Sequence, residues 1–282
     1  MKLIATWTQK NRGFGIGLLV GALTVGSAFP HLLRTFGSLE EWKAVLYLAA
    51  FFAALGGILA FLFVRPGPYN AKSPPFNWKY TGDIFRHREI FMVNLGYLGH
   101  MWELYAMWTW LPLFLVTSFK LTGTNLTWAG IWSFAIIAIG GLGSAIAGKL
   151  ADRMGRTAVT IGSLLVSGIC CLVAGSLFGA NPVWIVSLCL VWGFAVVADS
   201  AQFSACITEL AHPEYIGTAL TLQTSLGFLL TLITIRILPA LVSWMGWQGA
   251  FAFLAIGPIF GIWAMFTLRQ SPLSVKMANG RR

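Results

Sequence analysis

The chain has 282 residues, of which 57% are hydrophobic and only 10% are charged. A soluble domain of this length could not bury so much apolar surface, so these values exclude an ordinary soluble protein. The formal net charge of +10 would suit nucleic acid, but the position of each Lys and Arg relative to the apolar runs is the better test. That position, given below, favours the lipid bilayer over nucleic acid as the partner.

Apolar runs long enough to cross about 30 Å of hydrocarbon recur along the whole chain. Their continuous apolar character favours helices over the alternating strands of a membrane barrel. The sequence therefore predicts an all-α, polytopic membrane helical bundle of about eight transmembrane helices. The predicted spans are residues 13–36, 41–64, 89–118, 127–147, 157–179, 183–207, 216–241 and 248–268.

Most of the 19 Lys and Arg residues fall on one side of these spans. Those on that side lie in residues 2–12, 65–88, 149–156 and 269–282. The opposite side has Arg34, Lys43 and Lys120, and Arg236 lies within a span. Because cytoplasmic loops are enriched in Lys and Arg, we expect an integral protein of the cell (inner or plasma) membrane with both termini in the cytoplasm.

The first two spans have a second copy near the end of the chain. In the first pair, Gly13 begins the first helix and Trp42 begins the second. Gly217 and Trp247 lie at the corresponding positions of the last pair. Transporters built as two equal halves contain such repeats, and the four spans between the copies lack a counterpart ahead of residue 13. Small residues at four-residue spacing also predict close helix contacts; they include Gly13, Gly17 and Gly21, and Gly140, Ser144 and Gly148.

Two ionisable residues lie near the middle of the third span. His100 and Glu103 are three residues apart, roughly on one helical face, and Trp102 and Tyr105 add aromatic groups beside them. Because an ionisable side chain in hydrocarbon costs at least a few kcal/mol, such residues are candidates for a substrate or proton pathway. The alternative is that His100 and Glu103 bond each other, or a neighbouring helix, and that the aromatic residues only pack.

The loop between the fourth and fifth spans reads GKLADRMGRT over residues 148–157. This pattern of glycine, acid and base resembles the cytoplasmic signature of the major facilitator superfamily, which joins the second and third helices of each half. The resemblance implies charge contacts that hold one access state during transport. The alternative is a loop that only anchors the chain by its positive charge. The residues concerned are Gly148, Asp152, Arg153, Gly155 and Arg156.

On this resemblance the chain is similar to an N-terminally truncated member of the family that covers about the last eight of twelve helices. Residues 1–64 are then the last two helices of the N-terminal half, and residues 65–88 are the cytoplasmic central loop. Residues 89–268 form the C-terminal six-helix half, and residues 269–282 form a cytoplasmic tail.

Four further polar residues lie in the later spans: Asp199, Gln202, Gln223 and Arg236. We expect Asp199 to pair with Gln223 at a similar depth, either as a bond between helices or as part of the pathway. Arg236 either extends to the outer surface or faces inward, where its guanidinium would favour an anionic substrate.

These features predict a secondary active transporter, a permease that moves a small polar or anionic organic solute by alternating access. Proton-coupled symport is a hypothesis that rests on His100, Glu103 and Asp199. The alternatives are a truncated, non-transporting membrane protein or partner subunit and, with less support, a polytopic membrane enzyme. We expect no enzyme activity, cofactor or metal site, because no clustered nucleophile or metal set is present and the four Cys residues lack metal-ligand spacing. The expected partners are the solute, the bilayer and protons.

Overall fold

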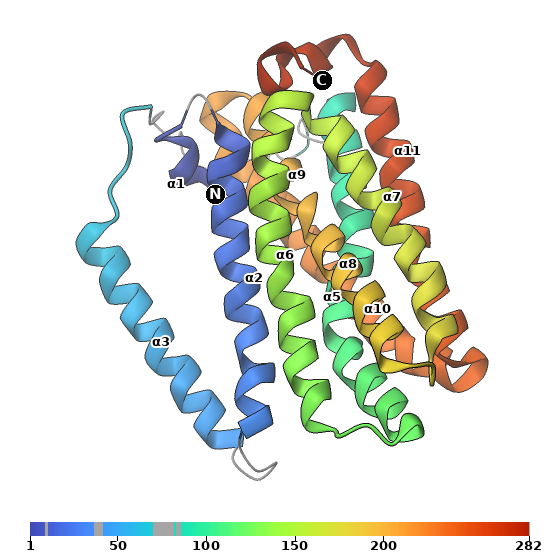
Figure 1. Ribbon diagram of the computed structural model, residues 1–282. Coiled ribbons are helices and arrows are strands. Elements are labelled where there is room, and N and C mark those ends of the chain that lie inside the picture. The colour runs from blue at the N-terminus through green and yellow to red at the C-terminus, as the bar shows by residue number, and fades with distance from the viewer. Residues whose placement is uncertain (9–10, 37–41, 70–81, 83–85, 282) are drawn as a thin grey trace.

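The computed structural model describes residues 1–8, 11–36, 42–69, 82 and 86–281, and within these ranges the chain forms helices and no strand. The predicted all-α fold is therefore confirmed. The elements in chain order (Figure 1) are α1 Lys2–Ala5, α2 Arg12–Phe36, α3 Trp42–Phe63, α5 Arg88–Thr122, α6 Thr127–Met154, α7 Arg156–Ala174, η1 Gly175–Leu177, α8 Pro182–Ala198, α9 Ser200–Leu210, η2 Pro213–Tyr215, α10 Ile216–Leu254, α11 Ile256–Gln270 and η3 Pro272–Gly280.

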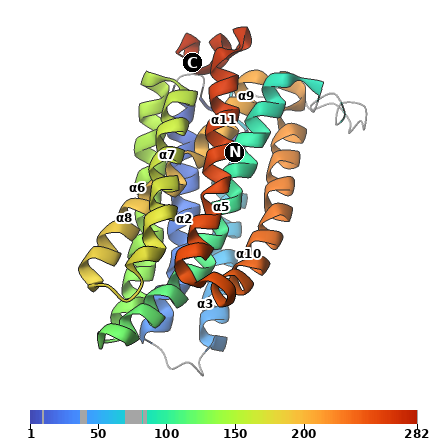
Figure 2. The same cartoon turned by 90° about the vertical axis from the view of Figure 1, so that its right-hand side faces the viewer.

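Seven helical stretches in the described part of the chain are long and apolar enough to cross a membrane. The last of them, Pro213–Gln270, has 58 residues, which is about 87 Å of helix and far too long for one crossing of about 30 Å. It reverses at Gly246, whose φ of 69° and ψ of −179° lie in a region open essentially to glycine alone. The first arm of α10 and the returning α11 run in opposite directions and both pack against α5, which lies between them (Figure 2). Six single spans and this pair agree with the predicted number.

Helix α2 lies along α6 (Figure 1), and small residues make this close contact possible. A Cβ added to Gly17 would lie 2.5 Å from the carbonyl oxygen of Ser144, and one added to Gly21 would lie 2.8 Å from that of Gly141. Helix backbones approach this closely only where side chains are small. The predicted close contact is thus confirmed for Gly17, Gly21 and Ser144, whereas Gly140 packs against Gly193 and Val197 of α8.

Helix α3 stands apart from the rest of the bundle (Figure 1), and none of its apolar window is buried. It touches α2 through Phe29 and Phe52, whose ring centroids lie 6.0 Å apart. Side chains such as Tyr47 and Phe61 are exposed by 74% and 89%. In a bilayer these apolar side chains would face lipid or another protein.

Helix α5 runs through the middle of the bundle and contacts α6, α8, α9, α10 and α11. Buried apolar residues around it form two large clusters. One cluster takes residues of α5 from Leu104 onward, and the other takes residues from Ile90 to Met101. His100 and Glu103 therefore lie where the two clusters meet.

One end of the bundle carries both ends of the chain, the starts of α2, α5, α7 and α10, and the last turns of α6, α9 and α11 (Figure 1). We call it the basic end because Arg12, Arg88, Arg153, Arg156, Arg269 and Arg281 gather there. The segment η3 folds back over it, with Ser274, Met277 and Ala278 buried. Most of the predicted central loop, residues 65–88, lies outside the described residues.

Candidate functional site

A histidine and an aspartate form a buried contact in the middle of the bundle. His100 of α5 and Asp199, the residue between α8 and α9, are each 1% exposed, and imidazole Nδ1 lies 2.8 Å from carboxylate Oδ1. The rings of Tyr97 and Phe203 stand 6.0 and 5.6 Å from the imidazole ring, so the pair is shielded from solvent and screened little by salt. The predicted pairing of Asp199 with Gln223 is wrong, because both amide atoms of Gln223 are buried without a hydrogen-bond partner.

Glu103 contacts different neighbours from His100. Its carboxylate accepts hydrogen bonds from Ser167 at 3.0 Å and Cys171 at 3.2 Å, both on α7, and from the indole N–H of Trp192 on α8. Both carboxyl oxygens of Glu103 therefore have hydrogen-bond donors on neighbouring helices. His100 and Glu103 do not bond each other; His100 bonds Asp199, and Glu103 bonds side chains of α7 and α8.

The aromatic residues predicted for the pathway point toward other helices. The ring of Trp102 lies 5.4 Å from that of Phe253, and the ring of Tyr105 lies 5.1 Å from that of Phe228. Arg236 is exposed on α10. The structure thus brings His100 together with Asp199, whereas Trp102 and Tyr105 contact α10.

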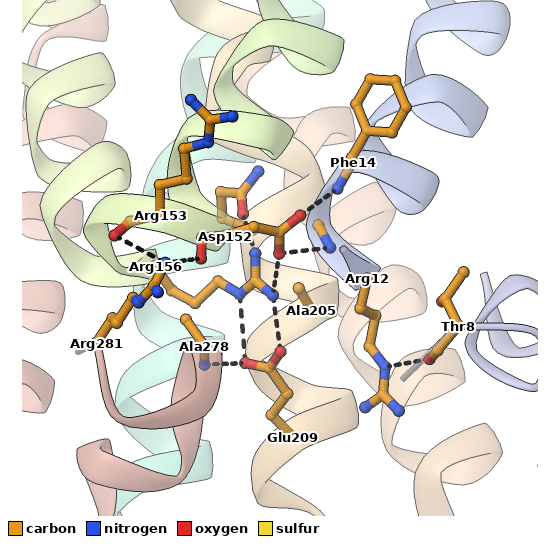
Figure 3. Close-up of polar contacts among 12 residues, drawn as sticks. Thr8, Arg12, Phe14, Asp152, Arg153, Arg156, Ala205, Glu209, Ala278 and Arg281 are labelled. Carbon is orange, nitrogen blue, oxygen red and sulfur yellow. Dashed lines mark hydrogen bonds and ion pairs between the residues drawn. The ribbon is translucent and has the colours of Figure 1, made fainter. Parts of the chain in front are cut away.

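A denser group of charges lies at the basic end (Figure 3). Arg156, the first residue of α7, is 1% exposed, and its Nη2 lies 2.8 Å from Oδ1 of Asp152 and 2.7 Å from Oε1 of Glu209. Its Nε also donates to Oε2 of Glu209 at 3.3 Å, so the guanidinium binds that carboxylate through two donors. One buried cation is therefore compensated by two carboxylates in a favourable geometry.

The same Asp152 reaches across to α2 (Figure 3). Its Oδ1 accepts a hydrogen bond from the backbone N–H of Gly13 at 3.1 Å, and its Oδ2 accepts one from that of Phe14 at 3.0 Å. These donors belong to the first turn of α2, where backbone N–H groups are unpaired and the helix dipole is positive. A Cβ on Gly13 would overlap Nη1 of Arg156, so glycine lets α2 approach this group.

The glycines of the 148–157 motif have two separate roles. Gly155 alone connects α6 to α7, with a φ of 103° that favours glycine. Gly148 packs against α2, where a Cβ would overlap the carbonyl oxygen of Gly13. Arg153 is exposed, and its carbonyl oxygen accepts a hydrogen bond from Arg281 at 3.4 Å.

Gln202 lies between the buried His100–Asp199 pair and the charges of the basic end. It follows Asp199 by three residues on α9 and is 0% exposed. Its Oε1 accepts a hydrogen bond from Nη1 of Arg156 at 3.3 Å, whereas its Nε2 is buried without a partner. Polar groups therefore extend from the middle of the bundle to α2.

Some contacts of the basic end have only weak signals in the sequence, or none. The predicted sixth span ends at residue 207, so Glu209 could have been placed on the side where the arginines of the motif lie. Its second contact, an N–H from Ala278 to Oε2 at 3.0 Å, depends on how η3 folds back and has no pattern to reveal it. The same holds for Arg12, which donates to the carbonyl oxygen of Thr208 at 3.2 Å.

A cavity of about 1110 Å³ opens beside these charges, and the predicted pathway residues are not among those that line it. Its lining includes Lys2, Arg12, His87, Glu89 and Glu209. Within the described ranges, no group of three or more His, Cys, Asp or Glu side chains could hold a metal ion.

Comparison with known proteins points to one family. The family model described as Major Facilitator Superfamily matches residues 1–235. The chain is 29% identical over 175 residues to the inner membrane metabolite transport protein YhjE of Escherichia coli, a match that covers 56% of this chain and 40% of that protein.

Two other relatives give similar coverage. An uncharacterized MFS-type transporter of Bacillus subtilis, YfnC, is 29% identical over 59% of this chain and 37% of its own length. A probable L-galactonate transporter of Escherichia coli is 22% identical over 62% of this chain and 41% of its own length. The chain thus spans about two fifths of the length of the curated relatives it matches.

Proposed function

The chain belongs to the major facilitator superfamily, and on this premise we propose that it forms part of a secondary transporter that moves a small polar or anionic organic solute by alternating access. Two relatives are named as a metabolite transport protein and a probable L-galactonate transporter. Those names support a small, polar metabolite as the solute.

The contact between Asp152 and the first turn of α2 carries this proposal. It consists of two hydrogen bonds to backbone N–H groups, of 3.1 and 3.0 Å, and it closes one end of the interface between α2 and α6. Small residues along that interface allow one helix to shift against the other. We propose that this contact is a gate, which forms when the basic end is closed and breaks when it opens.

The orientation and the division into halves belong to the same proposal. The basic end would face the cytoplasm, because Lys and Arg are enriched on that side of membrane proteins. Residues 1–64 would be two helices of one half, residues 89–268 the six-helix half, 65–88 the central loop and 269–282 a cytoplasmic tail. The α2–α6 interface would then lie between the halves, as a gate requires.

Proton coupling is proposed on the basis of His100 and Asp199. They form an ionisable pair in the membrane interior, where such groups are candidates for proton binding. Glu103 is less suited to this role, because the hydroxyl, thiol and indole donors of Ser167, Cys171 and Trp192 already satisfy its carboxylate.

Uptake into proteoliposomes tests the proposed transport. The full chain is reconstituted, and uptake of radiolabelled L-galactonate is followed with D-glucose as the uncharged comparison. We expect time-dependent uptake above that of protein-free liposomes, lowered in Asp152→Asn and kept in Lys149→Gln, a change at an exposed position of α6. Uptake no greater than in protein-free liposomes would contradict transport by this chain.

The exposure of α3 favours a second candidate, a subunit that does not transport alone but packs against another membrane protein. A photo-crosslinking residue at Phe61, which is 89% exposed, would test this in native membranes. A single defined cross-linked product together with absent uptake would favour the subunit. Cross-linking to lipid alone would contradict it.

A further inference from the structure

We propose that Gln202 is a positioning residue that relays protonation of the His100–Asp199 pair to the gate between Asp152 and α2. The inference rests on the proposed function, because it takes this contact as the gate. It goes further by assigning the coupling between protonation and the gate to the amide group of Gln202. It also gives the direction of the coupling, because a proton added to Asp199 loosens the gate.

Close contacts connect the two groups except at one gap. His100 Nδ1 lies 2.8 Å from Asp199 Oδ1. Arg156 Nη1 donates to Gln202 Oε1 at 3.3 Å, and Arg156 Nη2 lies 2.8 Å from Asp152 Oδ1. The gap lies between Asp199, which immediately precedes α9, and Gln202, three residues further on, a spacing at which helical side chains are neighbours.

The polar atoms on either side of this gap lack hydrogen-bond partners. Nε2 of Gln202 has none, and the carboxylate oxygens of Asp199 have only the contact with His100. A buried donor and a buried acceptor one turn apart gain free energy by bonding, directly or through a water. While Asp199 is ionised, Gln202 is best satisfied with its NH₂ group toward Asp199 and its oxygen toward Arg156.

Protonation of Asp199 reverses that preference. While Asp199 is ionised, its carboxylate accepts from Nδ1 of His100. A proton taken from solution on the side to which the site is open adds to a carboxylate oxygen and forms an O–H group that needs an acceptor.

The amide oxygen of Gln202 can accept from this O–H group if the amide turns about its last torsion. Its NH₂ group then faces the guanidinium of Arg156, which is also a donor, and the hydrogen bond between them is lost. Arg156 is held less firmly beside Asp152, and the gate weakens. The relay moves no group beyond a side-chain amide, which suits the close packing around it.

Other titratable groups surround the His100–Asp199 pair, and a test must distinguish their pH response from that of the pair. Glu103 is the second buried carboxylate among the described residues, and its bonds run to α7 and α8. On α10, Gln223 does not titrate and Arg236 is exposed. Other titratable groups on these elements include Tyr97 and Tyr105 on α5, Arg156, Cys170 and Cys171 on α7, Cys189 on α8, and Cys206 and Glu209 on α9; Arg88, Glu89 and Lys120 lie at the ends of α5.

Hydrogen–deuterium exchange of the peptide that contains Gly13 and Phe14 measures the gate directly, because those amides donate to Asp152. The full chain in lipid nanodiscs is labelled at about pH 7.5 and about pH 5.5, on either side of the ordinary histidine range. Labelling times are scaled for the intrinsic pH dependence of exchange. We expect protection to fall at the lower pH by at least about tenfold, as for the loss of a hydrogen bond to a charged group.

Substitutions assign this response to Gln202. Gln202→Met removes the amide oxygen and the NH₂ group and should abolish the response. Gln202→Glu offers Arg156 an acceptor at both pH values and should keep the gate closed. The matched control is Gln223→Met, which removes an equally buried amide that makes no bond to Arg156. Asp199→Asn should also abolish the response, and Glu103→Gln should leave it intact.

The outcomes distinguish failure of the proposed gate from failure of the relay through Gln202. If Asp152→Asn leaves the protection of Gly13 and Phe14 unchanged, the proposed gate itself fails. If Asp152→Asn lowers protection but the unaltered chain shows no pH response, only the relay fails. A response that persists in both Gln202 variants, or that is lost equally in Gln223→Met, would also overturn the relay. Should Gln202→Met unfold, Gln202→Glu still gives the decisive comparison.

Discussion

Arg156 is buried, and its charge is met by carboxylates from two different helices, Asp152 on α6 and Glu209 on α9. A guanidinium removed from water is costly unless it is paired with good geometry. The two carboxyl side chains are 10% and 12% exposed, so water reaches them while the cation stays buried. Such an arrangement holds the basic end together and still allows the carboxylates to be hydrated when a contact breaks.

Replacing Arg156 should destabilise the protein markedly. In Arg156→Met, Asp152 and Glu209 lose their shared cation, and we expect a loss of about 3 kcal/mol, as for a buried ion pair with one partner removed. Denaturant unfolding in detergent micelles measures the change. Arg153→Met, at an exposed position of the same motif, is the control and should shift stability by no more than about 0.5 kcal/mol. Equal losses in the two variants would contradict a special role for Arg156.

The partners of His100 and Glu103 illustrate what the sequence could not reveal at this scale. A spacing of three residues separates two side chains by only about 60° around a helix, so it predicts that both lie on one helical face. Helix α5, however, is surrounded by other helices, so 60° is enough to direct His100 to Asp199 and Glu103 to α7 and α8. The sequence fixes the angle between the two side chains but not the neighbours they meet.

At the scale of elements, the contact between α2 and α6 was largely predictable. Small residues at four-residue spacing occur in both spans, and the structure puts Gly17 against Ser144 and Gly21 against Gly141. Glycine alone could not identify the contact, because another glycine of α2 has no neighbour. Gly26 has no atom within 4 Å of its Cβ position.

This difference gives a matched pair of substitutions within one helix. Gly17→Ala adds a methyl group 2.5 Å from the carbonyl oxygen of Ser144, and overpacking of this kind costs about 1–3 kcal/mol. Gly26→Ala meets no atom and gains helix propensity, so it should be neutral or stabilising by up to about 1 kcal/mol. Denaturant unfolding and the exchange of α2 amides measure both variants. An equal effect of the two changes would contradict close packing at Gly17.

At the scale of the whole molecule, hydropathy predicted the spans because crossing the bilayer demands a minimum apolar length regardless of packing. The reversal within α10 agrees with the predicted break between residues 241 and 248. The lateral order of the helices was not predictable, since lipid-facing and buried helices are similarly apolar. The return of η3 over the basic end was equally hidden, because it depends on the burial of Met277 and on backbone contacts.

The orientation predicted from charge can be tested with lysines that the chain already has. Lys43 and Lys120 are exposed at one end of the bundle, and Lys149 and Lys276 are exposed at the basic end. If the basic end is cytoplasmic, a membrane-impermeant amine reagent added to intact cells without an outer barrier should modify Lys43 and Lys120 only. Permeabilised cells, in which all four should react, are the control, and peptide mass spectrometry measures the extent at each site. Modification of Lys149 and Lys276 in intact cells would reverse the orientation and place the Asp152 gate on the outer side of the membrane.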